Sequence, residues 1–271
     1  MSRETPASTV IEGAARSIRA AYSSPTPARW VREVIESSDM ASAYAVQHAN
    51  TRAWEAEGRR VVGHKIGLTS PKVQQQLGVD RPDFGALFSD MACADGEVIW
   101  IDRLRRPRME GEAALVIGRS LTAVDLTLSE LMSAVEYVVP AIEIVDTRYE
   151  SWQITLADTI ADNASSGLFV IGGRPVLLHQ TDLGAVQMQL SRDGESVSSG
   201  SGRDCLGHPL RAALWLARTL AELGSPLQPG HFVLTGALGP MVDLADVRAG
   251  MDVHCEIQGL GGVRCRFEPP L

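Results

Sequence analysis

The first part of the chain has apolar residues at every third or fourth position, a spacing that predicts an amphipathic helix. These residues are Ile11, Ala14, Ala15, Ile18 and Tyr22. The segment Ser-Ser-Pro-Thr-Pro at 23–27 ends that helix, because proline interrupts helical hydrogen bonding. Asp39 is well placed to cap a second helix, which we expect to run to about Glu57 and to stop at Gly58. Residues 1–58 are therefore predicted to form a small helical N-terminal region.

From residue 59 onward the apolar residues occur in short runs, which predicts strands. The expected strands cover residues 61–66, 97–101, 109–117, 137–145, 168–171, 186–190, 195–199, 231–235, 253–257 and 263–267. Residues 193–194 (Asp-Gly) are expected to form a hairpin turn. A strongly apolar helix is expected between Pro209 and Gly224, and a short one after Pro71. Because the strands do not alternate regularly with helices, residues 59–271 are predicted to form one β-rich body of an α+β fold.

The composition is that of an ordinary globular protein. The chain has 271 residues, of which 45% are apolar and 21% are charged, so disorder of the bulk of the chain is excluded. No apolar run approaches the ~20 residues that a membrane-spanning helix needs. The first ten residues lack the apolar core of a secretory signal, and the four cysteines form no CxxC pair. A cytoplasmic location is therefore expected.

The net charge of −8, without a basic tract, argues against sequence-independent binding of nucleic acid. Of the 25 cationic residues only Lys65 and Lys72 are lysines. A lysine in an unusual setting is therefore worth attention, because arginine serves elsewhere in this chain.

The first candidate for chemistry is a group of three carboxylates. Glu110 and Glu112 are two residues apart in a predicted strand, so their side chains point to the same face. Glu143 is a third carboxylate within an apolar strand. Such a set, without histidine or cysteine, suits Mg²⁺ or Mn²⁺. Spacing alone favours the alternative, in which Glu110 and Glu112 are solvated and Glu143 pairs with an arginine, because charged residues usually face water.

Two further candidates carry single charged groups. Lys65 lies in an apolar strand flanked by glycines, where it could bind a carboxylate or act as an acid or base; a solvent-facing lysine at a strand edge is the alternative. His64 would point to the opposite face of that strand. Asp83 lies in a Pro-Asp-Phe-Gly segment that we expect to be a turn, where a cap of the backbone is the more common role.

Two segments of small residues could contact a ligand. Residues 161–167, which include Asn163 and Ser165, could hold an anion, although a helix end explains them equally well. The loop that starts at Thr235 and Gly236 allows close approach of the backbone to a ligand, although a plain turn is the default. The sequence contains no GxGxxG after a strand, no P-loop, no HExxH and no GxSxG.

The wording and the order of these motifs are more specific than each motif alone. Residues 63–85, GHKIGLTSPKVQQQLGVDRPDFG, resemble the 2-keto-4-pentenoate (2-hydroxypenta-2,4-dienoate) hydratases of the fumarylacetoacetate hydrolase superfamily. The resemblance continues through PRMEGE at 107–112, PAIEIV at 140–145, ADNASSG at 161–167, CLGHPL at 205–210 and TGALGP at 235–240. It covers most of the chain beyond about residue 40. The family usually has a larger residue where this chain has Gly111.

The resemblance implies a twisted β-roll body of the fumarylacetoacetate hydrolase C-terminal type, with a helical N-terminal region. It implies Mg²⁺ or Mn²⁺ bound by three glutamates, with two further residues at the active site and three in substrate-binding segments. The metal ligands would be Glu110, Glu112 and Glu143, the active-site residues Lys65 and Asp83, and the substrate-binding residues Ser165, Thr235 and Gly236.

The implied reaction is the addition of water to a 2-hydroxy-2,4-dienoate, through the 2-oxo-3-enoate, to give a 4-hydroxy-2-oxo acid in the meta-cleavage degradation of aromatic compounds. We expect Lys65 to hold the substrate's carboxylate or enolate oxygen, and Asp83, or a glutamate not fully committed to the metal, to move protons and orient water. The alternatives are a 4-oxalocrotonate-type decarboxylase and a non-catalytic subunit that partners it. The resemblance also implies a homo-oligomer, with the decarboxylase or aldolase of the pathway as possible partners, and no partner among nucleic acids or membranes.

Overall fold

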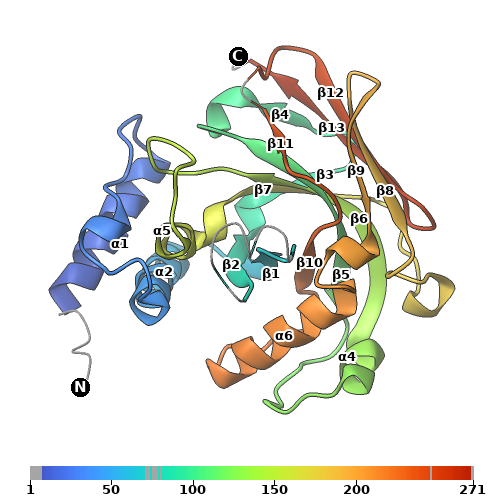
Figure 1. Ribbon diagram of the computed structural model, residues 1–271, viewed down its shortest axis with the longest axis horizontal. Helices are drawn as coiled ribbons and strands as arrows, with labels where there is room; N and C mark the ends of the chain where they lie inside the picture. The colour runs from blue at the N-terminus through green and yellow to red at the C-terminus, as the bar shows by residue number, and fades with distance from the viewer. Residues whose placement is uncertain (1–7, 71–73, 75–78, 80, 245, 270–271) are drawn as a thin grey trace.

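The computed structural model describes residues 8–70, 74, 79, 81–244 and 246–269. Two helices, α1 (Ser8–Tyr22) and α2 (Met40–Ala56), precede a body of strands (Figure 1). The strands are β1 (Val61–Gly67), β2 (Asp83–Phe88), β3 (Ala92–Ala94), β4 (Val98–Trp100), β5 (Arg108–Ile117), β6 (Val135–Val145), β7 (Ser166–Ile171), β8 (Gln187–Arg192), β9 (Glu195–Ser201), β10 (Phe232–Ala237), β11 (Val242–Asp243), β12 (Met251–Ile257) and β13 (Gly261–Glu268). The helices of the body are α4 (Leu128–Ala134), α5 (Leu156–Ala161) and α6 (Pro209–Glu222).

The strands of the described residues form two sheets. The larger sheet has the order β2-β1-β10-β5-β6-β7-β3, with β11 paired to β5, and the smaller has the order β4-β13-β12-β8-β9. Strands β5 and β6 form a long antiparallel pair, from Arg108 opposite Val145 to Ile117 opposite Val135. This strongly curved pair forms one wall of the body (Figure 1). The mixed, curled sheets confirm the predicted α+β class of fold.

Gly111 lies where the two sheets approach each other. A Cβ atom built there would lie 2.7 Å from Cys255 Sγ of β12 and 2.8 Å from Met188 Sδ of β8. Both distances are shorter than van der Waals contact, so these two side chains fill the space that a larger residue at position 111 would need. The glycine therefore affects the packing between the sheets, on the strand face opposite to Glu110 and Glu112.

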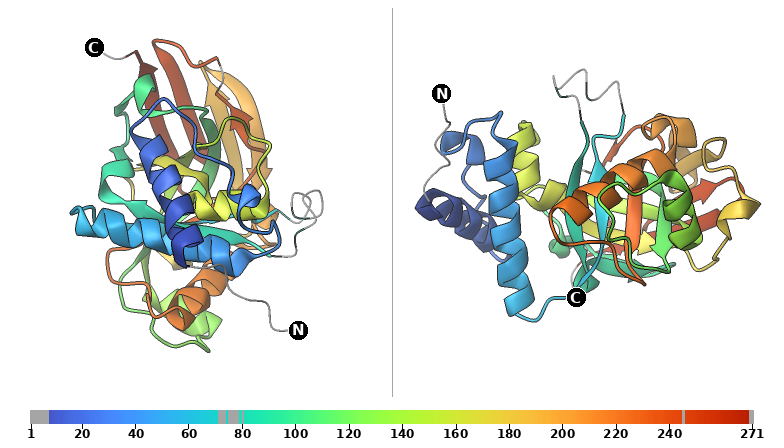
Figure 2. Two further views of the ribbon diagram at one scale, coloured as in Figure 1. Left: turned by 90° about the vertical axis from the view of Figure 1, so that its left-hand side faces the viewer. Right: turned by 90° about the horizontal axis from the view of Figure 1, so that it is seen from below.

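The N-terminal helices share a core with part of the body. A hydrophobic cluster separate from the main core joins Ile18 of α1 and Val46 of α2 to Tyr149 and Ile160. Figure 2 shows α1 and α2 beside α5, at one end of the strand body. The helices are thus fixed to the segment between β6 and β7, and the domain boundary near residue 58 remains a prediction.

Most predicted elements are present, often with local signals that explain their ends. Asp39 caps α2, since its carboxylate accepts a hydrogen bond from the Ser42 amide at 3.1 Å. Residues 193–194 form the turn between β8 and β9, and Pro209 is the first residue of α6. The helix expected after Pro71 lies outside the described residues.

Helix α4 and the strands β2, β3 and β11 were not predicted from the sequence. Helix α4 starts at a capping box of Thr127 and Glu130, a signal that the sequence does contain. The expected turn at Asp83 is wrong, because Asp83 is the first residue of β2. Every residue of β2 is buried, so pairing with β1 and burial decide its conformation in place of the local turn preference.

A buried arginine ties the loop between β6 and β7 to the rest of the fold. Arg148 Nε donates to Asp162 Oδ1 at 2.7 Å, and its guanidinium also donates to the carbonyl oxygens of Asp162 and Ser166. The guanidinium lies over the ring of Tyr22 in α1. Because Arg148 and Asp162 are both nearly inaccessible to solvent, each depends on the other for its neutralisation.

We expect Arg148→Met to lower the free energy of unfolding by about 3–5 kcal/mol, since it leaves the Asp162 carboxylate buried without its partner. Denaturant-induced unfolding followed by circular dichroism measures this change. Arg248→Met is the matched control, because its ion pair with Asp193 is of similar length, 2.6 Å, but exposed. Equal destabilisation by the two substitutions would contradict a structural role for Arg148.

Candidate active site

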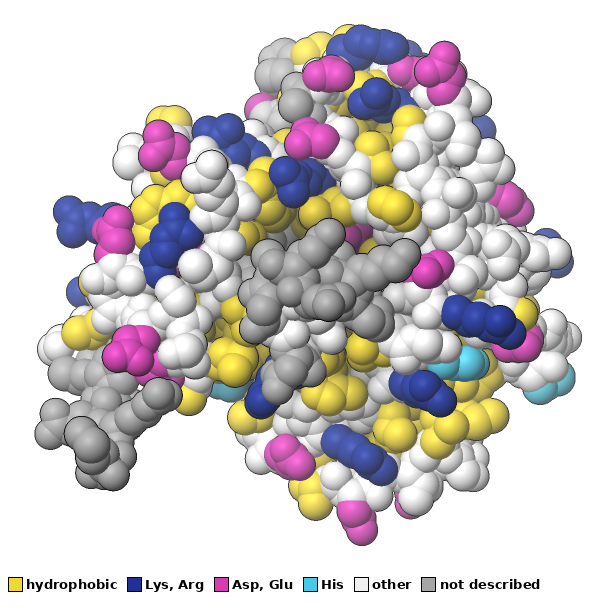
Figure 3. Space-filling view, viewed as in Figure 1, with side chains coloured by type: hydrophobic (Ala, Val, Ile, Leu, Met, Phe, Trp, Pro, Cys, Tyr) yellow, Lys and Arg dark blue, Asp and Glu magenta, His cyan; other side chains and the backbone are white. Residues whose placement is uncertain are grey.

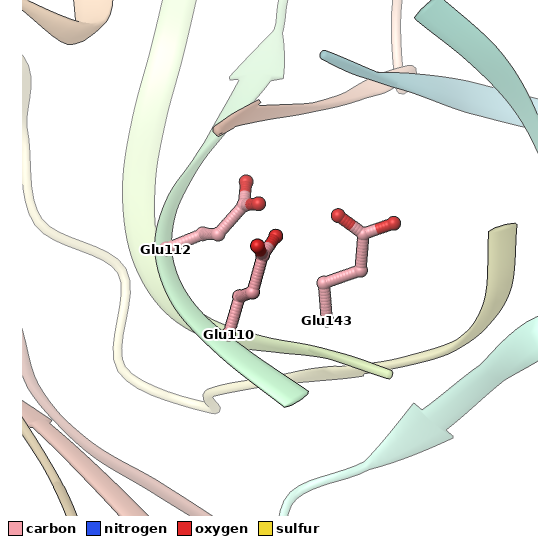
Figure 4. Close-up of side chains that lie close together, drawn as sticks. All are labelled: Glu110, Glu112 and Glu143. Atoms are coloured by element: carbon pink, nitrogen blue, oxygen red, sulfur yellow. The ribbon is translucent and has the colours of Figure 1, made fainter. Parts of the chain in front are cut away.

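Strands β5 and β6 bring three carboxylates to one place. Glu110 and Glu112 project from the same face of β5, and Glu143 of β6 lies directly opposite Glu110 in the antiparallel register. One oxygen atom from each of the three lies within 4.8 Å of the others. Figure 4 shows the three carboxylates turned toward a common space. Among the described residues, this is the one group of acidic, histidine or cysteine side chains close enough to hold a metal ion.

These carboxylates lie in a setting that disfavours their negative charge. Glu112 and Glu143 are buried, and Glu110 is partly buried. Burial, followed by repulsion from Glu143, raises the pKa of Glu110 to about 7 and raises the pKa of Glu112 well above its usual range. Glu112 Oε1 and Glu143 Oε2 have no hydrogen-bond partner among the described residues. The three carboxylates therefore leave oxygen atoms without donors, and this all-oxygen donor set fits a hard divalent cation.

Lys65 supplies an ammonium group to the same site. Its Nζ atom lies 2.7 Å from Glu143 Oε1, and its side chain is only 3% exposed, so it is not the solvent-facing lysine of a strand edge. Burial by itself would lower the pKa of Lys65, but Glu143, Asp83 and Glu110 outweigh that effect and raise the pKa. Its ion pair with Glu143 makes the lysine a charged hydrogen-bond donor within the site.

Asp83 lies on the same side of the sheet as Lys65. In the β1–β2 register Asp83 is opposite Gly67, two residues from Lys65, and a side chain at position 67 would collide with the Asp83 carboxylate. Asp83 is buried, and its Oδ1 atom has no hydrogen-bond partner among the described residues. Burial raises the pKa of Asp83 to about 6, although Lys65 opposes this shift. Such a carboxyl group can both accept and release a proton near neutral pH.

The loop after β10 orients one of the glutamates. The Gly236 amide donates a hydrogen bond of 2.7 Å to Glu112 Oε2, which leaves Oε1 of that carboxylate for another partner. Gly236 has a φ of 108°, and a Cβ atom there would collide with the side chain of Thr69. Glycine is therefore required for this amide to reach Glu112.

The two hydroxyl groups expected to bind substrate make contacts within the protein. Thr235 Oγ1 donates to the Ala113 carbonyl oxygen at 2.9 Å, and Ser165 Oγ lies 3.1 Å from Thr159 Oγ1. Both residues are buried. Direct contact of either hydroxyl with a substrate stays a prediction.

Sequence reasoning missed a residue that positions Asp83. The Asn163 side chain accepts a hydrogen bond from the Ala86 amide at 2.7 Å and donates one to the Ala86 carbonyl oxygen at 2.8 Å. The side-chain amide of Asn163 thus pairs with β2 as the backbone of a neighbouring strand would. It is used within the fold, whereas residues 161–167 were considered as a segment that could offer amides and hydroxyls to an anion. The sequence suggests an anion-binding segment or a helix end at Asn163, and no local signal shows that its partner is a strand far away in the sequence.

Tyr44 is a second missed residue. Its ring stacks on Phe84, with 4.7 Å between the ring centres, so helix α2 extends to the neighbourhood of Asp83. Burial, and then the Asp83 carboxylate, raises the pKa of Tyr44, which therefore stays protonated. Its position in a predicted N-terminal helix contains no signal of this contact.

Comparison with known proteins agrees with this geometry. Residues 61–268 match the fumarylacetoacetate (FAA) hydrolase C-terminal family. The chain belongs to this family, in its 2-keto-4-pentenoate hydratase branch. It is 54% identical over 256 residues to 2-keto-4-pentenoate hydratase 1 of Dechloromonas aromatica (strain RCB), covering 94% of this chain and 96% of the relative. It is 50% identical over 257 residues to the 2-keto-4-pentenoate hydratase of Paraburkholderia xenovorans (strain LB400), covering 95% and 94%. The predicted resemblance to this group of hydro-lyases is confirmed.

A solved structure of a related enzyme has the same fold. The 4-oxalocrotonate decarboxylase from Pseudomonas putida G7, complexed with magnesium and adipate, superposes with a TM-score of 0.90 at 34% identity. The match covers 98% of this chain and 100% of that one. This extent includes the N-terminal helices, so both parts of the fold are shared with the decarboxylase.

Gly236→Ala tests the support that the backbone provides to Glu112. The added methyl group displaces the amide from Glu112 Oε2, and loss of such support typically weakens metal binding by about 10- to 100-fold. Titration calorimetry with Mn²⁺ measures the change. Gly230→Ala is the matched control, since Gly230 also has a positive φ, of 84°, but its Cβ position is open. Equal Mn²⁺ affinity of the two variants would show that the Gly236 amide does not support a metal ligand.

Proposed function

We propose that the protein is a hydratase dependent on Mg²⁺ or Mn²⁺ that converts a 2-hydroxy-2,4-dienoate into a 4-hydroxy-2-oxo acid, in a meta-cleavage pathway. The observation that carries the proposal is one site that combines three converging glutamates with a charged lysine and an aspartate whose Oδ1 atom has no hydrogen-bond partner among the described residues. The similarity of 50% or more to proteins named 2-keto-4-pentenoate hydratase supports the substrate class.

The three glutamates would hold the cation. Their oxygen atoms converge within 4.8 Å of one another. Lys65 is the basic group in contact with them, through Glu143. When bound, the divalent cation supplies electrophilic stabilisation of negative charge on substrate oxygens. The Gly236 amide holds Glu112 in place, so the ligand set is ordered before the cation arrives.

Lys65 would bind the anionic end of the substrate. Its buried ammonium group can donate to the substrate's carboxylate or to the oxygen at C2 while it remains near Glu143. In a site with little access to solvent this interaction is stronger than in water. Lys65 thereby favours an enolate over the neutral enol in both halves of the reaction.

Asp83 would move protons. In the first half, the enol proton leaves the oxygen at C2 and a proton is added at C5, which gives the 2-oxo-3-enoate. In the second half, water adds its oxygen at C4 and a proton reaches C3, so that one water molecule is consumed overall. The unpaired, buried Oδ1 of Asp83 can accept a proton from water and return one to carbon.

Decarboxylation of a 2-oxo-3-enedioate is the second candidate, because the fold and 34% of the sequence are shared with 4-oxalocrotonate decarboxylase. The higher identity to the named hydratases favours hydration. A non-catalytic subunit is disfavoured, since Lys65 and the three glutamates are all present in one arrangement.

The proposed hydratase function also leads to expectations about partners and location. We infer a homo-oligomer located in the cytoplasm, with the decarboxylase or aldolase of the pathway as further partners. No helix of the described residues is long and apolar enough to cross a membrane. Acidic and basic side chains are interspersed on the face shown in Figure 3, an arrangement that offers no continuous basic surface for nucleic acid.

Assays with freshly prepared 2-hydroxypenta-2,4-dienoate distinguish these functions. We expect Mg²⁺-loaded protein to remove the ultraviolet absorbance of the dienol and to release no CO₂ from a 2-oxo-3-enedioate. Exhaustive chelation should abolish the activity, and Mn²⁺ or Mg²⁺ should restore it. Release of CO₂ would identify a decarboxylase, whereas turnover that survives chelation would refute the metal-dependent mechanism.

Substitutions at Lys65 and Asp83 test their roles in turnover. Lys65→Met and Asp83→Asn should each lower kcat by about 100-fold or more, because a charged donor or a proton carrier is lost. Circular dichroism should show that both variants remain folded. Asp90→Asn is the control for Asp83→Asn, since Asp90 is an exposed aspartate that pairs with Arg59 at the surface. Turnover of wild-type size in a folded variant removes that residue from the mechanism.

A further inference from the structure

A cavity of about 560 Å³ lies on the reverse side of the strands that carry Lys65 and Asp83. Helix α2, strands β1 and β2, the C-terminal end of α6 and the loop before β10 supply its lining. Figure 1 shows these elements around the short strands β1 and β2, with α2 on one side and α6 below. The volume is within the range of about 300–1,000 Å³ that is usual for small-molecule sites.

Strand alternation separates this cavity from the proposed active site. On β1, His64 lines the cavity while the next residue, Lys65, contacts Glu143. On β2, Phe84 and Ala86 line the cavity, and Asp83 points to the other side. No residue assigned above to the metal, to catalysis or to substrate binding is part of the lining. The cavity is therefore a separate space behind a shared pair of strands.

One polar side chain in this lining lacks a partner. His64 is 8% exposed, and its Nδ1 atom has no hydrogen-bond partner among the described residues. The ring of His231 lies 6.3 Å from the ring of His64, and Nδ1 of His231 already accepts a hydrogen bond from the Gln228 amide. An unpaired buried nitrogen is costly, so burial of this ring against the cavity is not explained by hydrogen bonding within the described residues.

The charges at the mouth favour an anion. The Arg59 guanidinium is occupied by Asp90, which accepts hydrogen bonds of 3.1 and 2.8 Å. The Arg60 guanidinium has no ion pair within the part of the chain that the structure describes, and it is exposed. Glu55 is the one carboxylate in the lining. A ligand carrying a single negative charge therefore has an available cation in Arg60.

The remaining walls favour an apolar, flat body. Phe84, Leu220 and Leu223 contribute apolar surface, and the imidazole rings of His48, His64 and His231 contribute flat surfaces. Burial, followed by repulsion from the neighbouring histidines, lowers the pKa of His64 to about 3, so its ring is neutral at physiological pH. Neutral imidazoles also suit a transition metal, but these three rings are not among the described groups whose ligand atoms converge within 4.8 Å.

We propose that this cavity is a second ligand-binding site, which takes a small organic monocarboxylate with a flat apolar body. The carboxylate binds Arg60, and the apolar body packs against Phe84, the ring of His64 and the two leucines of α6 and its C-terminal end. Because β1 and β2 form a wall of both sites, a ligand here also contacts the strands that position Lys65 and Asp83.

Histidine NMR provides a test with internal controls. The chain has six histidines, of which His48, His64 and His231 line the cavity and His179, His208 and His254 do not. We expect benzoate, added to Mg²⁺-loaded protein labelled with ¹³C at histidine Cε1, to shift the first three signals saturably and to leave the other three unchanged. Benzamide, which has the same shape without the charge, should bind roughly tenfold more weakly.

Variants at the exposed rim decide whether the cavity is responsible. Arg60→Gln should weaken benzoate binding roughly tenfold or more, and Leu223→Trp should block it, while Arg52→Gln, on α2 but outside the lining, should have no effect. Glu112→Gln should also leave it unchanged, because the metal site is separate. The proposal is wrong if benzoate causes no shifts, or if the shifts persist in both rim variants. It is also wrong if the shifts disappear in Glu112→Gln. Shifts caused by Zn²⁺ in place of benzoate would overturn it in favour of a metal site.

Discussion

The repulsion among buried carboxylates is the constraint on which the site depends. Glu110, Glu112 and Glu143 converge within a few ångströms, and Asp83 adds a fourth acidic group. Lys65 is the cation that this part of the structure shows in direct contact with them. One ammonium group cannot neutralise this charge, so burial and the neighbouring carboxylates raise the pKa of Glu110 and of Glu112. A bound divalent cation would supply the missing positive charge. An all-oxygen donor set with this excess of negative charge fits a hard divalent cation.

The rest of the fold holds these charges at close range against their repulsion. The long β5–β6 pair sets the register that places Glu143 opposite Glu110, and a sheet is stiff enough to maintain it. Gly67 leaves room for the Asp83 carboxylate, which a side chain at position 67 would displace. Gly236 lets its own backbone amide reach Glu112. Asn163 fixes the outer edge of β2, so that Asp83 is positioned by hydrogen bonds from a distant loop. The site is therefore a property of the packed sheet rather than of any one segment.

The pair of strands β1 and β2 carries buried side chains on both faces. One face carries Lys65 and Asp83 toward the acidic cluster, and the other carries His64 and Phe84 toward the cavity between α2 and α6. Alternation of side chains along a strand makes this arrangement a necessity once both faces are buried. A ligand on the second face would therefore act on the first through the backbone of β1 and β2 alone.

The sequence by itself determined the class of fold, the helical start of the chain and most strands, because hydrophobic periodicity, helix caps and a hairpin turn are local signals. It also determined that Glu110 and Glu112 share one face, since alternation in a strand is a local property. Spacing could not show that Glu143 lies opposite Glu110, and the resemblance to a known family was needed to favour a metal site over solvated glutamates. Only the tertiary structure decided that Asp83 begins a buried strand, that the Gly236 amide holds Glu112, and that Asn163 replaces a neighbouring strand. Those contacts join residues far apart in the chain, and their energies depend on burial and register, which no local pattern contains.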